Sequence, residues 1–252
     1  GEGIVAHGPL QRNKYNNEDV GEMNEMWIRQ DWLDKLGLEV PRTWDEMAAV
    51  AKAFVTQDPD GNGEDDTIGI LGPGNSNHIN DIGDNQFGLD PLFCSFQSYP
   101  QYWLQDEDGT VKYGSIQPET RTALEKIQKL YTDKLIDPEM LVRSNCQETL
   151  LSGKVGIFFG PWWSGYTFAD ATLAGEADWR AYFTPLSEDG NYYTHMPDPT
   201  SKYVVVSKSC KNPEAAFKMI SYLVANEQHW TDDGITSSDM SCADFYPLWN
   251  GY

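Results

Sequence analysis

A helix, an acidic loop and a short apolar strand follow one another over residues 43–72, and this order strongly constrains the fold. Thr43 and Glu46 match a capping box, in which the side chain of each residue bonds the backbone amide of the other. The predicted helix then continues through apolar residues at helical spacing: Met47, Val50, Ala51 and Phe54. The segment 67–72, TIGILG, is short, apolar and punctuated by glycine, which favours a strand.

The loop between them, DPDGNGEDD at residues 58–66, resembles the opening of a calcium-binding loop. Oxygen-bearing residues occupy every second position: Asp58, Asp60, Asn62, Glu64 and Asp66. Calcium takes six to eight oxygen ligands, so we expect these residues to coordinate it, with Glu64 using its carbonyl and Thr67 adding a hydroxyl or carbonyl. Gly69 replaces the bidentate Glu of an EF-hand, and no helix follows. The alternative is a solvated acidic turn, but the spacing favours structural Ca²⁺ without EF-hand architecture.

Other segments show the same mixture of helical and extended patterns. We predict an amphipathic helix within residues 24–41, with Gly37 as its C-cap and Pro41 as a stop. We predict a hairpin around an Asp-Gly turn over 106–113, and a helix after Pro118 with Ala123, Ile127, Leu130 and Tyr131 on one face. We also predict strands over 154–163 and 203–206, and a helix that begins at Asn212 and Pro213. Helices that alternate with short strands indicate an α/β fold.

The composition limits the kinds of partner that the protein can bind. The formal net charge is −21 and the sequence pI is about 4.3, which argues against nucleic-acid binding and against an anionic membrane surface. No apolar run approaches the roughly 18 residues of a membrane span. The four cysteines are too widely spaced to decide between disulfides and free thiols. The chain starts at Gly1 rather than Met, which is typical of an excised or processed segment.

Four motifs in order resemble the family 1 extracellular solute-binding proteins, in particular the LplA-like lipoproteins of carbohydrate ABC transporters. They are MWIRQDWLDKLGLEVPRTWDEM, the DPDGNGEDD loop, YGSIQPET with LYTDKLIDPE, and SGKVGIFFGPWW. The resemblance implies a periplasmic-binding-protein-like type II fold, helix-rich α/β, in which two lobes close over a sugar. It also implies permease subunits as partners and an extracellular, lipid-anchored location. In alginate-binding relatives the loop matching Asp58–Thr67 holds calcium away from the ligand cleft.

Family members carry a first lobe before the segment that matches this chain. We therefore expect residues 1–252 to form one solute-binding-protein-like domain, mostly the second lobe, with the N-terminal lobe absent and the two-lobed architecture incomplete.

Sugar sites combine aromatic platforms with polar side chains, because pyranose faces pack on rings while hydroxyl groups need hydrogen-bond partners. Two segments show that combination, and the resemblance places both near the cleft. One supplies Trp162 and Trp163 just after an apolar strand, and the other, 95–103, supplies Tyr99 and Trp103 among amides and hydroxyls. The tryptophans at helical spacing are expected in the core: Trp27, Trp32 and Trp44. Arg29 and Asp31 are expected to form a structural ion pair.

Catalysis is not expected. A glycoside hydrolase needs two carboxylates, and the abundance of Asp and Glu makes candidate pairs uninformative. The chain lacks G-x-S-x-G, H-E-x-x-H and a phosphate-binding glycine loop, and its four histidines are scattered. A second alternative is a calcium-dependent carbohydrate-binding adhesin module. The sequence favours a carbohydrate-binding component of an ABC transporter over both.

Overall fold

The structure is a computed structural model that describes residues 5–6, 24–74, 86–183, 186–194 and 204–220. The chain divides into two compact units, residues 1–199 and residues 200–252. Each unit is treated by itself below. The assignment of both units to one solute-binding domain stays a prediction.

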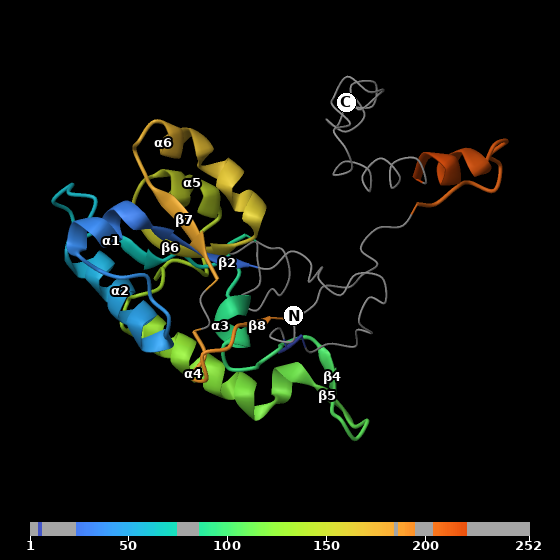
Figure 1. Cartoon of the computed structure of the whole chain (residues 1–252), viewed down its shortest axis with the longest axis horizontal. Coiled ribbons are helices and arrows are strands. Elements are labelled where there is room, and N and C mark those ends of the chain that lie inside the picture. Colours follow the sequence, from blue (N-terminus) through green and yellow to red (C-terminus); the bar gives the residue numbers. More distant parts are fainter. Residues whose placement is uncertain (1–4, 7–23, 75–85, 184–185, 195–203, 221–252) are drawn as a thin grey trace, which may run out of the picture. The chain divides into compact units, whose positions relative to one another are not determined.

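A four-stranded mixed sheet forms the centre of the first unit (Figure 1). Its strands, in spatial order, are β3 (Ile68–Ile70), β6 (Val155–Gly160), β2 (Glu25–Arg29) and β7 (Trp179–Tyr182). Strand β6 runs parallel to β3, and β2 runs antiparallel to both β6 and β7. All six residues of β6 are buried, as the apolar run at 154–163 predicts for a central strand covered on both faces.

Helices cover both faces of this sheet (Figure 1). The longer helices are α1 (Gln30–Leu36), α2 (Trp44–Thr56) and α4 (Pro118–Thr132). The shorter ones are α3 (Asp90–Cys94), α5 (Cys146–Leu151), α6 (Ala169–Leu173) and the 3₁₀ turns η1 (Gly114–Ile116) and η2 (Trp162–Thr167). Met26 and Ile28 face the core beneath α1, α2 and α4, while Trp27 faces the core beside α5 and η2. The predicted helix-rich α/β class is confirmed.

The predicted helix over residues 24–41 is wrong at its amino-terminal half. Residues 25–29 form β2, and helix α1 begins only at Gln30. Because a hydrophobic core packs on each face of the sheet at β2, both faces of the strand are buried and its apolar residues do not alternate with polar ones. The resulting run of apolar residues fits helical and strand periodicity alike, and pairing with β6 and β7 decides between them.

The other local predictions in this unit are confirmed. Thr43 and Glu46 form the capping box of α2, and Gly37 ends α1 in the left-handed conformation at φ 67°. In α4, three of the four predicted residues are buried, and Tyr131 is partly exposed. The Asp-Gly turn joins the hairpin strands β4 (Trp103–Gln105) and β5 (Val111–Tyr113). Two further short strands, β1 (Val5–Ala6) and β8 (Tyr193–Thr194), pair in parallel.

The predicted core tryptophans and ion pair are also confirmed. Trp27, Trp32 and Trp44 are buried. The Arg29 guanidinium donates two hydrogen bonds to Asp31, at 2.8 and 2.5 Å, and its carbon lies 4.5 Å from the centre of the Trp32 ring. Of the cysteines, Cys94 and Cys146 are buried, Cys210 is exposed, and Cys242 lies outside the described residues.

In the second unit, the strand predicted over 203–206 is not found at Val204–Val206, and Tyr203 lies outside the described residues. These valines are exposed, with Val205 90% exposed, and within residues 204–220 no strand pairs with them to stabilise an extended conformation. The helix predicted to begin at Asn212 and Pro213 is confirmed, since residues 214–220 are helical and the Ala215 amide donates to the Asn212 carbonyl.

Candidate functional site

One edge of the central sheet collects the loops that are suited to binding. Strands β3, β6 and β7 end at this edge and β2 begins there, because β2 runs opposite to the other three. In open α/β sheets, ligands bind beyond the carboxyl ends of the strands. We call this end of the sheet the carboxyl edge; Figure 1 shows it where β2 begins.

Trp162 and Trp163 lie at the carboxyl edge, on turn η2 directly after β6. Trp162 is 55% exposed and meets the ring of Tyr166 edge to face at 6.0 Å, and Tyr166 is itself 76% exposed. Trp163 is half-buried. The neighbouring rings of Trp162 and Tyr166 therefore form a solvent-facing aromatic platform. The sequence pattern predicts Trp162 and Trp163 for this role and does not single out Tyr166.

The platform rests on a rigid base. Beneath it, the Trp27 indole donates from Nε1 to the Gly160 carbonyl at 3.1 Å and packs edge to face against Phe168 at 5.1 Å. A side chain at Gly165 would lie 3.4 Å from this indole, so the turn sits directly on it. The Gln86 amide bonds the Thr167 hydroxyl at 3.2 Å. These contacts fix the backbone that presents Trp162.

Polar groups that the sequence analysis missed lie at the same edge of the sheet, where β2 begins. Asn24 Nδ2 donates to the buried Asp90 carboxylate at 2.5 Å, and the Tyr192 hydroxyl donates to the Asn24 carbonyl at 3.0 Å. Burial raises the pKa of the Glu25 carboxyl above its ordinary value. Burial, and after it the charges of Asp90, Cys94 and Glu25, raises the pKa of the Tyr192 phenol. Only the strand pairing of β2 brings residues 24 and 25 to this edge.

Ser164, in the same turn, adds a buried hydroxyl. It is fully buried, and within the described part of the chain its Oγ has no hydrogen-bond partner. A side chain at Gly160 would meet this oxygen at 2.5 Å, which places it directly above the end of β6. A buried polar group of this kind costs free energy until something bonds it. At 0% exposure the hydroxyl can be bonded by an enclosed water molecule but not by a ligand on the surface.

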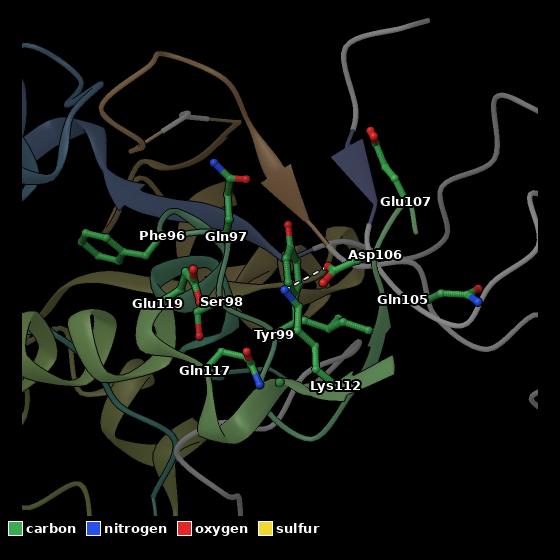
Figure 2. Close-up of a pocket in the computed structure, with 12 residues that line it drawn as sticks. Phe96, Gln97, Ser98, Tyr99, Gln105, Asp106, Glu107, Lys112, Gln117 and Glu119 are labelled. Atoms are coloured by element: carbon green, nitrogen blue, oxygen red, sulfur yellow. Dashed lines mark ion pairs between the residues drawn. The ribbon is translucent and has the colours of Figure 1, made fainter. Parts of the chain in front are cut away.

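The second predicted segment, residues 95–103, borders a separate hollow of about 330 Å³ (Figure 2). Its rim carries the Lys112–Asp106 ion pair at 2.9 Å together with Glu107, Glu119 and several amides. Tyr99 lies at the floor and is only 1% exposed, and burial raises its pKa. Trp103 does not line this hollow: it is 58% exposed and packs on Tyr113, its partner across the hairpin. The two aromatic residues therefore do not form one platform.

The acidic loop lies at the opposite end of the sheet. It precedes the amino end of β3, and Lys154, which pairs with Asp66, precedes the amino end of β6. Strand β6 has six residues, so the loop and the carboxyl edge are separated by roughly 17 Å along the sheet. A metal in this loop would therefore act on structure rather than on the ligand.

Hydrogen bonds already order the loop. The Asp58 carboxylate accepts from the amides of Gly61 and Gly63, each at 3.0 Å, and Asn62 Nδ2 lies 3.0 Å from carboxylate oxygens of both Asp60 and Asp66. The Asn62 carbonyl oxygen accepts from the Glu64 amide at 2.6 Å. Such side-chain-to-backbone bonds are typical of tight Asx turns.

The predicted ligand residues carry the oxygen atoms that calcium binds, but their side chains must rearrange to surround an ion. Burial, followed by the hydrogen bond and charge of Asp58, raises the pKa of Asp60, so a cation there would relieve repulsion. In the described residues no three acidic, His or Cys side chains converge on one point. Asn62 Nδ2 lies between the carboxylates, and rotation of this amide would present its oxygen instead. The Thr67 hydroxyl donates to the Phe54 carbonyl at 2.7 Å, which leaves the Thr67 carbonyl for a metal.

Comparison with known proteins decides the family. Residues 10–230 match the bacterial extracellular solute-binding protein family, which is most of the chain. The chain belongs to this family. Among curated relatives of this solute-binding protein, the polygalacturonan/rhamnogalacturonan-binding protein YtcQ of Bacillus subtilis is 33% identical over 135 residues, 53% of this chain and 25% of YtcQ. The fructooligosaccharide ABC transporter substrate-binding protein FusA of Streptococcus pneumoniae is 34% identical over 125 residues, 48% of this chain and 22% of FusA.

Solved structures agree on the fold. An HMO-binding, ABC-transporter-associated solute-binding protein from Bifidobacterium longum infantis superposes with a TM-score of 0.59 at 24% identity, covering 81% of this chain and 43% of that one. An EF-hand mutant of FusA in complex with fructo-nystose has a TM-score of 0.59 at 21% identity, covering 94% of this chain and 48% of that one. The periplasmic-binding-protein-like fold is thereby confirmed. The matched family and relatives are binding proteins of transporters, not enzymes.

This solute-binding protein spans about a quarter of the length of its matched curated relatives and under half of the superposed structures.

Proposed function

We propose that this chain belongs to the substrate-binding component of an ABC transporter that captures a carbohydrate, an oligosaccharide in particular, for import. The observation that carries the proposal is the exposed Trp162–Tyr166 pair, presented on a rigid turn at the carboxyl edge. Aromatic faces exposed beside hydrogen-bonding groups are what a sugar requires. The similarity to YtcQ, a polygalacturonan/rhamnogalacturonan-binding protein, and to FusA, a fructooligosaccharide substrate-binding protein, supports this ligand class.

The partners and the location follow from the same role. A transporter's binding component delivers its ligand to permease subunits, so we include these as partners. An extracellular location with a lipid anchor is supported by the family description and by the relative Lipoprotein LipO of Bacillus subtilis, 34% identical over 134 residues. Among the described residues, no helix combines the length and the apolarity that a membrane crossing requires.

Isothermal titration with a panel of neutral and acidic oligosaccharides tests the sugar-binding role. The chain offers a matched pair of variants, Trp162→Ala and Trp103→Ala, because the two indoles are similarly exposed, at 55% and 58%. We expect Trp162→Ala to lose most of the affinity and Trp103→Ala to keep it. The opposite result would move the site to the hairpin. Release of reducing ends during the titration would instead indicate a glycosidase.

We also propose that the acidic loop holds a structural Ca²⁺ through Asp58, Asp60, Asn62, Asp66 and the carbonyls of Glu64 and Thr67. The alternating spacing, the mutual repulsion at Asp60 and the ordered loop support the site. An ion bound only by the folded state stabilises it, by about 2.7 kcal/mol at a hundredfold excess over Kd.

Thermal unfolding with chelator and with calcium tests the metal. For a domain of this size we expect calcium to raise Tm by roughly 5–10 °C. Asp60→Ala should abolish that response. Asp65→Ala serves as the matched control, because Asp65 is an exposed carboxylate of the same loop outside the proposed ligand set. Identical melting curves with and without chelator would contradict the site.

A further inference from the structure

The carboxyl edge has a definite electrostatic character, set by two carboxylates. Asp90 is 2% exposed and is held by the Asn24 amide, whereas Glu25 is only partly buried. The Tyr192 hydroxyl donates to the carbonyl of Asn24, the residue that holds Asp90 and directly precedes Glu25. Tyr192 in turn packs edge to face with the exposed ring of Phe183 at 5.6 Å. The carboxylates therefore border a surface that also carries an exposed aromatic ring.

Glu25 lies on the same side of the sheet as the aromatic platform. Side chains alternate along a strand, so Glu25 shares the face of β2 that carries Trp27, and Trp27 lies beneath turn η2. Across the ladder Glu25 pairs with Gly160, over which the Ser164 hydroxyl and the Gln86 side chain lie. Trp162 follows Gly160 by two residues. A ligand resting on Trp162 would thus lie close to the Glu25 carboxylate.

The part of this edge that the structure describes carries no basic side chain. The described segments at this edge are 24–26, 71–74, 86–90, 160–168, 182–183 and 192–194, and they contain no Lys, Arg or His. The net charge of the whole chain, −21, adds a repulsive background for any anion.

We infer that this edge selects neutral oligosaccharides over those that carry uronic acids. The inference rests on the proposed sugar-binding function and specifies its ligand class. Neutral sugars carry hydroxyl donors, which carboxylates accept as strong, charge-assisted bonds. A sugar carboxylate near Glu25 would meet like charge, which at about 5 Å and an effective dielectric constant of about 20–40 weakens binding at least tenfold. One relative is named for an acidic glycan and another for a neutral one, so sequence similarity alone does not determine which class this chain binds.

Matched pairs of trisaccharides test the inference on the full chain. Maltotriose, cellotriose and α-1,4-galactotriose are each compared with the counterpart oxidised to carboxylate at C6. Titrations at 0.15 M and 0.5 M NaCl separate local repulsion from the screened background of the net charge. We expect the neutral member of each bound pair to bind at least tenfold more tightly at both salt concentrations.

Glu25→Gln keeps the shape of the side chain and removes one charge. It should therefore reduce the ratio of neutral to acidic trisaccharide affinity severalfold, by raising the affinity for the acidic trisaccharide. Glu176→Gln removes an equal charge from an exposed position in the loop before β7, at the other end of the sheet, and should leave the ratio unchanged. Equal or tighter binding of the acidic members would overturn the inference and leave sugar binding intact. Failure of all six sugars to bind would overturn the proposed function and the inference together.

Discussion

Replacing Trp27 by Phe should weaken sugar binding from inside the core. Trp27 is 9% exposed, bonds the Gly160 carbonyl and supports turn η2, yet lies beneath the surface that a ligand touches. Phenylalanine keeps an aromatic ring but loses the donor, worth about 0.5–1.5 kcal/mol, and leaves a small cavity beside Phe168. The two effects together predict a loss of about 1–3 kcal/mol in stability, or roughly 2–12 °C in Tm for a domain of this size.

Trp32→Phe is the matched control. Trp32 is 1% exposed and packs edge to face on Phe54 at 5.2 Å, on the opposite face of the sheet from η2. Circular dichroism gives Tm for both variants, and calorimetry well below Tm gives their affinity for the best sugar ligand. We expect both variants to be destabilised, but only Trp27→Phe to lose affinity, by severalfold. If Trp27→Phe keeps the affinity of the unmodified chain, the conformation of the turn does not depend on Trp27. If both variants lose affinity equally, the loss comes from general destabilisation of the fold.

Two further predictions concern stability. Gly156→Ala should destabilise the protein by about 1–3 kcal/mol in chemical denaturation, because the added Cβ would lie 2.2 Å from the ring of Phe54; an unchanged midpoint would show that α2 can move away. Burial raises the pKa of Glu25, so its ionisation costs stability as pH rises through the folded-state pKa. Glu25→Gln should therefore raise Tm at pH 7, with the gain disappearing below the unfolded pKa of about 4.3; a gain that grows toward low pH would refute this sign.

Much of the local structure could be predicted from the sequence, because caps and turns act over a few residues. Thr43, Gly37 and the Asp-Gly turn each determine a helix end or a hairpin through contacts with near neighbours. Strand β2 could not be predicted in the same way, since its conformation depends on β6 and β7, more than 100 residues further along the chain.

The residues of the candidate site also divide into those placed by their neighbours in sequence and those placed by distant tertiary contacts. Trp162 and Trp163 were predictable from a short apolar strand followed by Gly-Pro, which places the indoles on a loop. Tyr99 was not distinguishable from an exposed aromatic, because its burial comes from packing against Cys94 and Tyr193. Glu25 and Asp90 carried no sequence signal, since they approach Tyr192 only when β2 and α3 meet at the carboxyl edge.

Fluorine NMR of the chain labelled with 5-fluorotryptophan tests the central claim most directly, because each of its nine tryptophans reports separately. Resonances are assigned with single Trp→Phe variants and then followed as a bound neutral oligosaccharide is added. The account predicts that the Trp162 resonance shifts most and saturates with the binding isotherm, while the buried Trp32 and Trp44 resonances stay in place. A titration in which Trp103 shifts and Trp162 does not would contradict it.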